Sequence, residues 1–137
     1  MTTHHIKEDI HVLYVQAASF PDGIMAAFYK LNSVLPVGEK RALYGISYPE
    51  KLGKIIYKAA AEEKFPGEAK QFGCDSFVIR RGNYAGEVVP NFMKHVSSVG
   101  VTFQKLLQHP RLDPKGYCVE VYLNETDVQC LVKLVDE

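Results

Sequence analysis

A glutamate lies in the middle of an apolar, β-rich segment near the C-terminal end of the chain. Residues 116–125 read GYCVEVYLNE, and alternation along a strand places Cys118, Glu120 and Tyr122 on one face. The opposite face is wholly apolar or aromatic, so we expect it to pack against helices, and we expect Glu120 to face a groove. An unpaired carboxylate there would either take up a proton or require a cation. An ordinary solvated glutamate, paired with a lysine such as Lys133, is the other interpretation that the pattern leaves open.

Other residue types that commonly carry chemistry give weaker patterns. His4, His5 and His11 are close in sequence, but the first two lie in a polar terminus that we expect to be frayed, so no metal site is predicted. The chain has no paired-cysteine spacing, no HExxH, no GxSxG and no phosphate-binding glycine loop. No cofactor is expected. The cysteines are interpreted as reduced thiols, as in cytoplasmic proteins.

Hydrophobic spacing predicts the elements that must position Glu120. Two segments have apolar residues at helical spacing: 24–35 and 91–109. The β-rich segments are 10–18, 42–48, 53–63, 75–89, 116–125 and 127–137. The segment 75–89 is either a strand pair or one long strand bent at Gly82-Asn83. The resulting order, strand–helix–strand–strand, occurs twice, with a polar crossing between the two halves.

The two halves have the pattern of an internal duplication. Phe28 and Phe103 of the helices are 75 residues apart, and Tyr48 and Tyr122 of the hairpins are 74 apart. We therefore predict a single α+β domain over residues 1–137, built from a tandem β-α-β-β repeat of about 10–65 and about 75–137. Its one antiparallel sheet would carry two helices on one face and a ligand groove on the other.

Subtracting the hairpin offset of 74 from the residues on the face of Glu120 gives the equivalent positions in the first half of the chain. It selects Tyr44, Ile46 and Tyr48, and Tyr14 and Tyr57 on other strands are added as further aromatic walls. Aromatic rings around a carboxylate suit a flat lipophilic cation, because the rings supply apolar area and cation–π attraction. Each tyrosine can also be an amphipathic strand residue that contacts no ligand, and both interpretations remain open.

Composition excludes several functional classes. The chain has 137 residues, of which 47% are hydrophobic and 23% charged, as expected of one globular domain. Sixteen Lys+Arg balance sixteen Asp+Glu, so direct DNA binding is not expected. The apolar runs are too short to span a membrane, and residues 1–9 do not form a signal peptide. We expect a cytoplasmic protein.

The chain resembles a known family, and the match is best in its second half. The glutamate followed two residues later by an aromatic, Glu120 and Tyr122 in EVYL, and the segments DSFVIRRGNYAG and DVQCLVKL resemble the GyrI-like superfamily. That superfamily includes the effector-binding domains of bacterial multidrug-sensing regulators of the AraC and MerR types and gyrase-inhibitory proteins. The resemblance covers the chain from about Ile10 to Val135. It implies a groove at the repeat interface in which Glu120 meets lipophilic cations, with Tyr122 beside it and Phe92 at the rim.

The resemblance implies three alternative functions. The first is a stand-alone effector-binding protein for lipophilic, cationic compounds, linked to transcriptional regulation or drug sensing and without catalytic residues. We expect a stand-alone module because the regulators carry a helix-turn-helix domain for which these 137 residues have no room. The second is a hydrolase of strained, electrophilic natural products that uses Glu120 and Tyr122. The third is a gyrase-inhibitor-like module that binds a protein partner. A homodimer is also compatible with the sequence.

Overall fold

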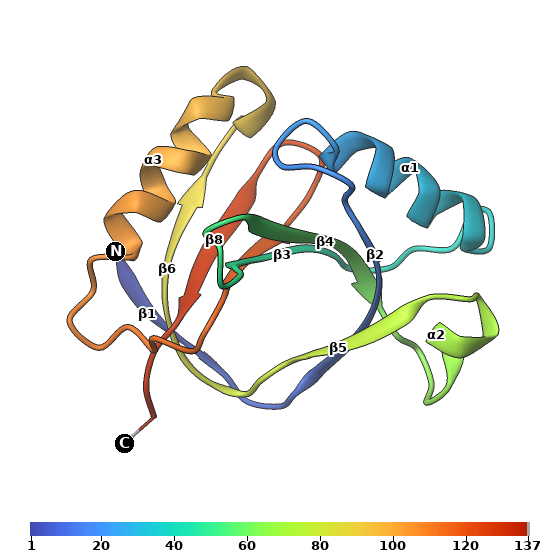
Figure 1. Ribbon diagram of the computed structural model, residues 1–137, viewed down its shortest axis with the longest axis horizontal. Helices are drawn as coiled ribbons and strands as arrows, with labels where there is room; N and C mark the ends of the chain where they lie inside the picture. The colour runs from blue at the N-terminus through green and yellow to red at the C-terminus, as the bar shows by residue number, and fades with distance from the viewer. Residues whose placement is uncertain (137) are drawn as a thin grey trace. The chain divides into compact units, whose positions relative to one another are not determined.

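The structure, a computed structural model, describes residues 1–136 (Figure 1). The chain forms two compact units: unit 1 contains Met1–Glu8 and the chain from Arg80 onward, and unit 2 contains Asp9–Ile79. Each unit has four antiparallel strands, so the fold is antiparallel α+β, as predicted from the sequence. No helix among residues 1–136 is long and apolar enough to cross a membrane.

Unit 2 pairs its strands in the order β3-β4-β2-β5. Its elements are β2 (Ile10–Gln16), α1 (Ile24–Val34), β3 (Leu43–Pro49), β4 (Ile55–Glu62), α2 (Glu68–Gln71) and β5 (Asp75–Ile79). The helix α1 packs on β4 and β2 through Ala27 and Leu31, which are four residues apart and therefore share one helical face. Beneath them lie apolar residues of the two strands: Leu13, Tyr57, Ala59 and Ala61.

Unit 1 pairs its strands in the order β1-β6-β8-β7. Its elements are β1 (Thr2–Ile6), β6 (Gly82–Val89), the 3-10 turn η1 (Phe92–Lys94), α3 (Val96–Leu106), β7 (Cys118–Tyr122) and β8 (Val128–Lys133). The helix α3 lies over β6 and β8, and its Leu106 is fully buried against Val128, Cys130 and Val132 (Figure 1).

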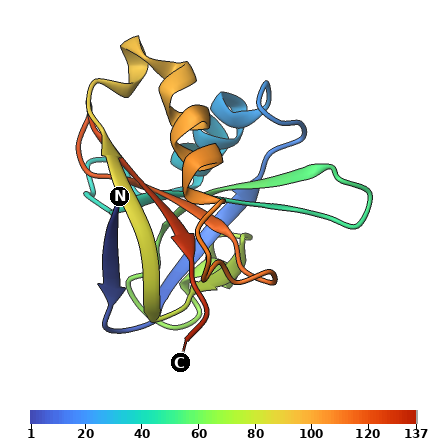
Figure 2. The ribbon, with the colours of Figure 1, turned by 90° about the vertical axis from the view of Figure 1, so that its left-hand side faces the viewer.

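The structure corrects three details of the sequence analysis. Residues 2–6, expected to be frayed, form β1 and pair with Gly82–Gly86 of β6 (Figure 2). The predicted helix over 91–109 is shorter, because Asn91 has a left-handed φ of 51° and His95, at φ −136°, separates η1 from α3. The segment 75–89 is two strands, and β5, which we assigned to the second repeat, pairs with β2 of unit 2.

The strand register of unit 1 shows which face α3 covers. Cross-strand partners in an antiparallel sheet point to the same face. Glu120 pairs with Cys130, and Cys130 packs in the same cluster as Leu106 of α3. Glu120 therefore lies on the helix-bearing face of its unit. Our expectation that its face is turned away from the helix was wrong.

The strand register of unit 2 shows why the positions that the offset of 74 selected are not equivalent to Glu120. Gly45 pairs with Ala59 on the face that α1 covers, whereas Tyr44, Ile46 and Tyr48 point to the other face. Glu120 thus corresponds to Gly45, at the helix offset of 75, and not to Ile46. A shift of one residue moves every side chain of a strand to the opposite face, so the hairpin offset of 74 selected the wrong side.

Candidate functional site

The carboxylate of Glu120 is at the centre of β7 and is half-buried. Its Oε1 accepts a hydrogen bond of 2.9 Å from the hydroxyl of Tyr122, which is two residues along and on the same face. Because α3 packs over β6 and β8, the β7 side chains on this face remain partly exposed. The hydroxyl donor of Tyr122 orients the carboxylate of Glu120 on this face.

Glu120 belongs to a row of side chains that crosses three strands. Glu87 of β6, Cys130 of β8 and Glu120 of β7 are consecutive partners in the register. The two carboxylate-bearing positions are two strand spacings, roughly 10 Å, apart. Lys105 of α3 donates a 2.7 Å hydrogen bond to Glu87, and this contact lowers the pKa of Glu87. Glu87 is therefore paired with Lys105.

Cys130 in this row is not a nucleophile. Its side chain is fully buried, and burial, together with the nearby charges of Glu120, Cys118 and Glu87, raises its pKa to about 12. The thiolate that attacks electrophiles is therefore absent at neutral pH. Cys130 contributes a small apolar surface between two carboxylates.

Aromatic side chains adjoin the carboxylate in unit 1. The rings of Phe92 and Tyr122 are tilted against each other with centroids 5.6 Å apart. The backbone N–H of Phe92 donates to the carbonyl of Thr126 at 2.9 Å, which fixes η1 beside the turn between β7 and β8. Cys118 and Tyr122 both contact the cluster beneath α3. The structure thus brings together four of the predicted site residues: Glu120, Tyr122, Cys118 and Phe92.

The tyrosines predicted from unit 2 fall into two groups. Tyr14, Tyr44 and Tyr48, with Ile46, lie on the face turned away from α1, and Tyr44 and Ile46 are buried. Burial and the charge of Glu62 raise the pKa of Tyr44.

Tyr57, the remaining predicted tyrosine, lies on the α1 face of unit 2. It is 2% exposed, and it stacks on Phe20 at 5.9 Å and meets the edge of Phe28 at 6.4 Å. The sheet of unit 2 separates it from Tyr14 and Tyr48.

Sequence reasoning missed Lys58, which lies among the aromatic residues of unit 2. Its ammonium nitrogen is 4.6 Å from the ring centroid of Tyr14, 4.9 Å from that of Tyr48 and 4.7 Å from that of Phe77. The signal that could have found it is the one that identified Glu120: a charged residue in the middle of an apolar strand, here IIYKAAAE.

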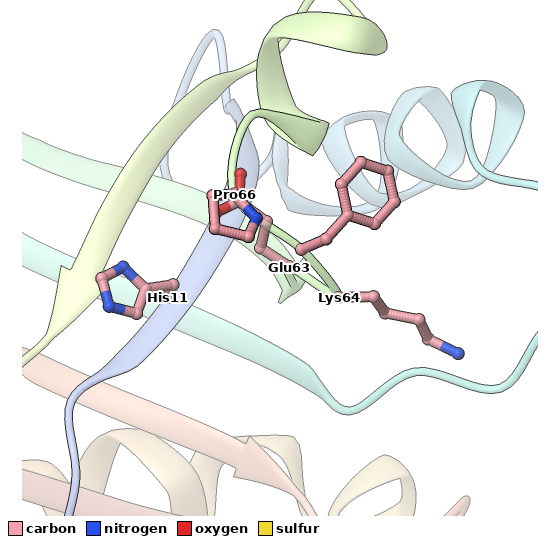
Figure 3. Close-up of a pocket in the computed structure, with 5 residues that line it drawn as sticks. His11, Glu63, Lys64 and Pro66 are labelled. Carbon is pink, nitrogen blue, oxygen red and sulfur yellow. The ribbon is translucent and has the colours of Figure 1, made fainter.

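A surface pocket of unit 2 is separate from all these residues. Its lining is His11, Glu63, Lys64, Phe65 and Pro66 (Figure 3). Glu63 is already used structurally, because its Oε2 accepts a 3.0 Å hydrogen bond from the backbone N–H of Ala69 in α2. None of the predicted ligand-binding residues lines this pocket, and we assign no function to it.

The sequence matches no family model and no curated protein. Solved structures do match. An integron cassette protein, VCH_CASS2, from the mobile metagenome of Vibrio cholerae is 12% identical, with 98% of this chain and 95% of that chain covered and a TM-score of 0.74. SAV2435 bound to tetraphenylphosphonium is 13% identical, with 96% and 93% covered and a TM-score of 0.66. A hydrolase from Listeria innocua is 12% identical, with 98% and 90% covered and a TM-score of 0.63. At these identities the likeness shows that the chain shares their fold.

Proposed function

We propose that this chain binds small lipophilic cations on the α3 face of unit 1, with Glu120 as the charged partner. The observation that carries the proposal is the half-buried carboxylate of Glu120 in the middle of β7, oriented by Tyr122 and separated by Cys130 from the Glu87–Lys105 pair. A partly desolvated carboxylate attracts a cation more strongly than one in bulk water. Phe92 and Tyr122 add aromatic surface and cation–π attraction.

The shared fold supports the ligand class. SAV2435 has this fold and is bound to tetraphenylphosphonium, a cation whose charge is surrounded by four phenyl groups. A delocalised, poorly hydrated cation of that kind loses little hydration when it leaves water, so one carboxylate and aromatic contacts suffice to hold it. Together with the GyrI-like resemblance, this supports an effector-binding role linked to drug sensing or transcriptional regulation. The zero net charge supports DNA contact through a separate partner rather than through this chain.

The test is the stabilisation of the protein by tetraphenylphosphonium. A ligand at 100 times its Kd raises the free energy of unfolding by about 2.7 kcal/mol, which a thermal-shift measurement resolves. We expect this shift in the wild type and its loss in Glu120→Gln, which keeps the shape of the side chain but not its charge. Glu125→Gln is the matched control, because it removes one charge from an exposed position of the same hairpin.

Two results would contradict the proposal. One is an equal shift in Glu120→Gln and in the wild type, which would place the cation elsewhere. The other is no shift in any protein at millimolar tetraphenylphosphonium. Circular dichroism of each variant without ligand shows whether the fold is intact, so that a lost shift is not mistaken for a lost structure.

A hydrolase is the second candidate, and one contact favours it. The hydrogen bond from Tyr122 holds Glu120 as a general base would be held, and a hydrolase from Listeria innocua shares the fold. Glu120 would take a proton from water as the water attacks a carbon of the strained ring and the ring C–O bond breaks, and the oxygen released from the ring would take a proton from solvent. Tyr122 would orient the base. Consumption of a strained electrophile such as styrene oxide by the wild type, but not by Glu120→Gln, would favour this function over simple binding.

A further inference from the structure

Lys58 is a largely buried lysine on the face of unit 2 that is turned away from α1. The residue is 7% exposed. Each of the four strands of the unit contributes one member of what we call the aromatic cage: Lys58 from β4, with Tyr14 of β2, Tyr48 of β3 and Phe77 of β5 around it. The three rings are half-buried, so the cage reaches the surface of this face.

Among residues 1–136, no side chain supplies an anion to Lys58. An ammonium carries three N–H donors. The Lys58 nitrogen is not among the fully buried side-chain atoms that lack a partner, so its donors reach the surface at the mouth of the cage. Within residues 1–136, no carboxylate forms an ion pair with Lys58, and its nitrogen donates to no protein acceptor. The rings stabilise the charge from the sides, but they leave the N–H donors without an oxygen acceptor of the protein.

Lys133 of unit 1 shows what a completed site of this kind contains. It is 6% exposed, it also lies on the face of its unit turned away from the helix, and its nitrogen is 5.4 Å from the ring of Tyr84. Unlike Lys58, it donates to the carbonyl of Leu134 at 2.7 Å and to both carboxylate oxygens of Asp136, at 3.2 and 3.3 Å. The oxygens present at Lys133 are the ones missing at Lys58.

We propose that the aromatic cage is a second ligand site, and that it takes an aromatic carboxylate. The ligand carboxylate would accept hydrogen bonds from the ammonium of Lys58, as the carboxylate of Asp136 does from Lys133. The aromatic ring of the ligand would lie against Tyr14, Tyr48 or Phe77. This site has the opposite charge preference from the one at Glu120, because the ammonium of Lys58 repels a cation. Tyr14 and Tyr48, which the sequence suggested as walls for a cation, thus surround the chain's own cation.

The experiment compares 2-naphthoate with 2-naphthamide, which has nearly the same shape but no charge. Isothermal titration calorimetry would be run at pH 7 on the wild type, Lys58→Met and Lys133→Met. We expect the wild type to bind the carboxylate at least about tenfold more tightly than the amide, as a charge-assisted hydrogen bond allows. We expect Lys133→Met to keep that preference, because Lys133 already has Asp136, and Lys58→Met to lose it.

A second measurement uses only the wild type, in case Lys58→Met does not fold. The ε-methylene group of Lys58 lies among three rings, whose ring currents shift its NMR signal away from those of the other lysines. In a protein labelled with ¹³C at this carbon, 2-naphthoate should move the shifted signal and 2-naphthamide should not. The proposal is overturned if the wild type shows no preference for the carboxylate, if Lys58→Met keeps the preference, or if the Lys58 signal stays in place at millimolar 2-naphthoate.

Discussion

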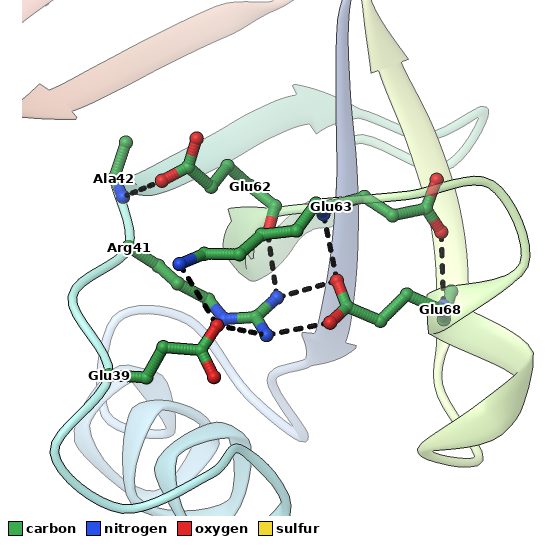
Figure 4. A network of polar contacts seen from close by, with 8 residues as sticks. Glu39, Arg41, Ala42, Glu62, Glu63 and Glu68 are labelled. Atoms are coloured by element: carbon green, nitrogen blue, oxygen red, sulfur yellow. Dashed lines mark hydrogen bonds and ion pairs between the residues drawn. The ribbon is translucent and has the colours of Figure 1, made fainter.

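Arg41 and Glu68 form a buried ion pair in unit 2. Their side chains are 3% and 2% exposed, and two parallel hydrogen bonds of 2.6 Å join the guanidinium to the carboxylate (Figure 4). Glu68 also accepts the backbone N–H of Lys64, and Arg41 donates to the carbonyl of Glu62. The hydrogen bonds from Arg41 lower the pKa of Glu68, and this effect exceeds the opposing effect of burial. The pair ties α2 and the end of β4 to the chain before β3.

Replacement of Glu68 by Gln should change the acid stability of the protein. Because the folded-state pKa of Glu68 is below the ordinary value of 4.5, its contribution to the free energy of unfolding is complete above that pH and is lost as the pH falls through the folded-state pKa. At pH 7 the variant removes the buried carboxylate partner of Arg41 and leaves it the more exposed carboxylate of Glu39, so we expect a cost below the roughly 3–5 kcal/mol of a fully unpaired buried charge. Urea unfolding at a series of pH values should show the difference from wild type shrinking below pH 4.5. A difference independent of pH would contradict this; the exposed Glu50→Gln is the control.

At the scale of single residues, the sequence grouped side chains that the structure places close together, but it assigned them to the wrong face of the sheet. Glu120, Tyr122, Cys118 and Phe92 were predicted together, and the structure brings them together in unit 1. Alternation divides a strand into two sets of side chains, but it does not say which set meets the helix when both contain apolar residues, such as Val119 and Cys118. Lys58 was overlooked because a lysine in a strand is usually solvated.

The two long helices show the internal repeat most clearly. Leu31 of α1 and Leu106 of α3 are 75 residues apart and are both fully buried, each at the centre of the cluster beneath its helix. Large-to-small changes at such positions cost the lost transfer free energy of the side chain plus that of the cavity left behind.

Leu31→Ala and Leu106→Ala should therefore have similar effects. We expect each to lower the free energy of unfolding by about 2–5 kcal/mol in urea titrations. Met25→Ala and Val101→Ala are matched controls on the same helices, because these side chains are 61% and 64% exposed, and they should change stability by less than about 0.5 kcal/mol. A small effect of only one of the two leucine substitutions would show that the helices are not equivalent in packing.

At the scale of elements, the sequence predicted which segments are helices and strands better than it predicted their pairing. The strands predicted within 10–18, 42–48, 53–63, 116–125 and 127–137 form, each with somewhat different ends, and the bend at Gly82, where φ is 132°, lies between β5 and β6. The predicted pairing failed where it depended on distant parts of the chain. β5 pairs with β2, and β1 pairs with β6. The spacing of hydrophobic residues within a strand does not reveal which strand it pairs with.

Considered as a whole, the chain builds unit 1 from two separate stretches. Residues 2–6 pair with residues 82–86, so two segments about 80 residues apart in the sequence form one edge of the unit 1 sheet. Without β1, one edge of β6 would expose unpaired N–H and C=O groups.

Deletion of residues 2–8 should therefore loosen unit 1. We expect amides of β6 that donate to β1 to lose protection from hydrogen exchange, and the protein to self-associate through the open edge, as light scattering would detect. His4→Ala is the control, because it removes an exposed side chain and keeps the backbone pairing. Unchanged exchange of the β6 amides in the deletion variant would mean that β1 does not protect this edge.

The aromatic cage of unit 2 can also be described as a receptor that is already filled. Lys58 reaches the rings on a covalent tether, so it occupies them at an effective concentration that a free amine in solution does not attain. An ammonium compound from outside must compete with this built-in occupant as well as with its repulsion. A substitution at position 58 alone thus decides whether the three rings exclude amines or bind them. Natural variation or protein engineering could therefore reverse the charge preference of this site with one amino-acid change.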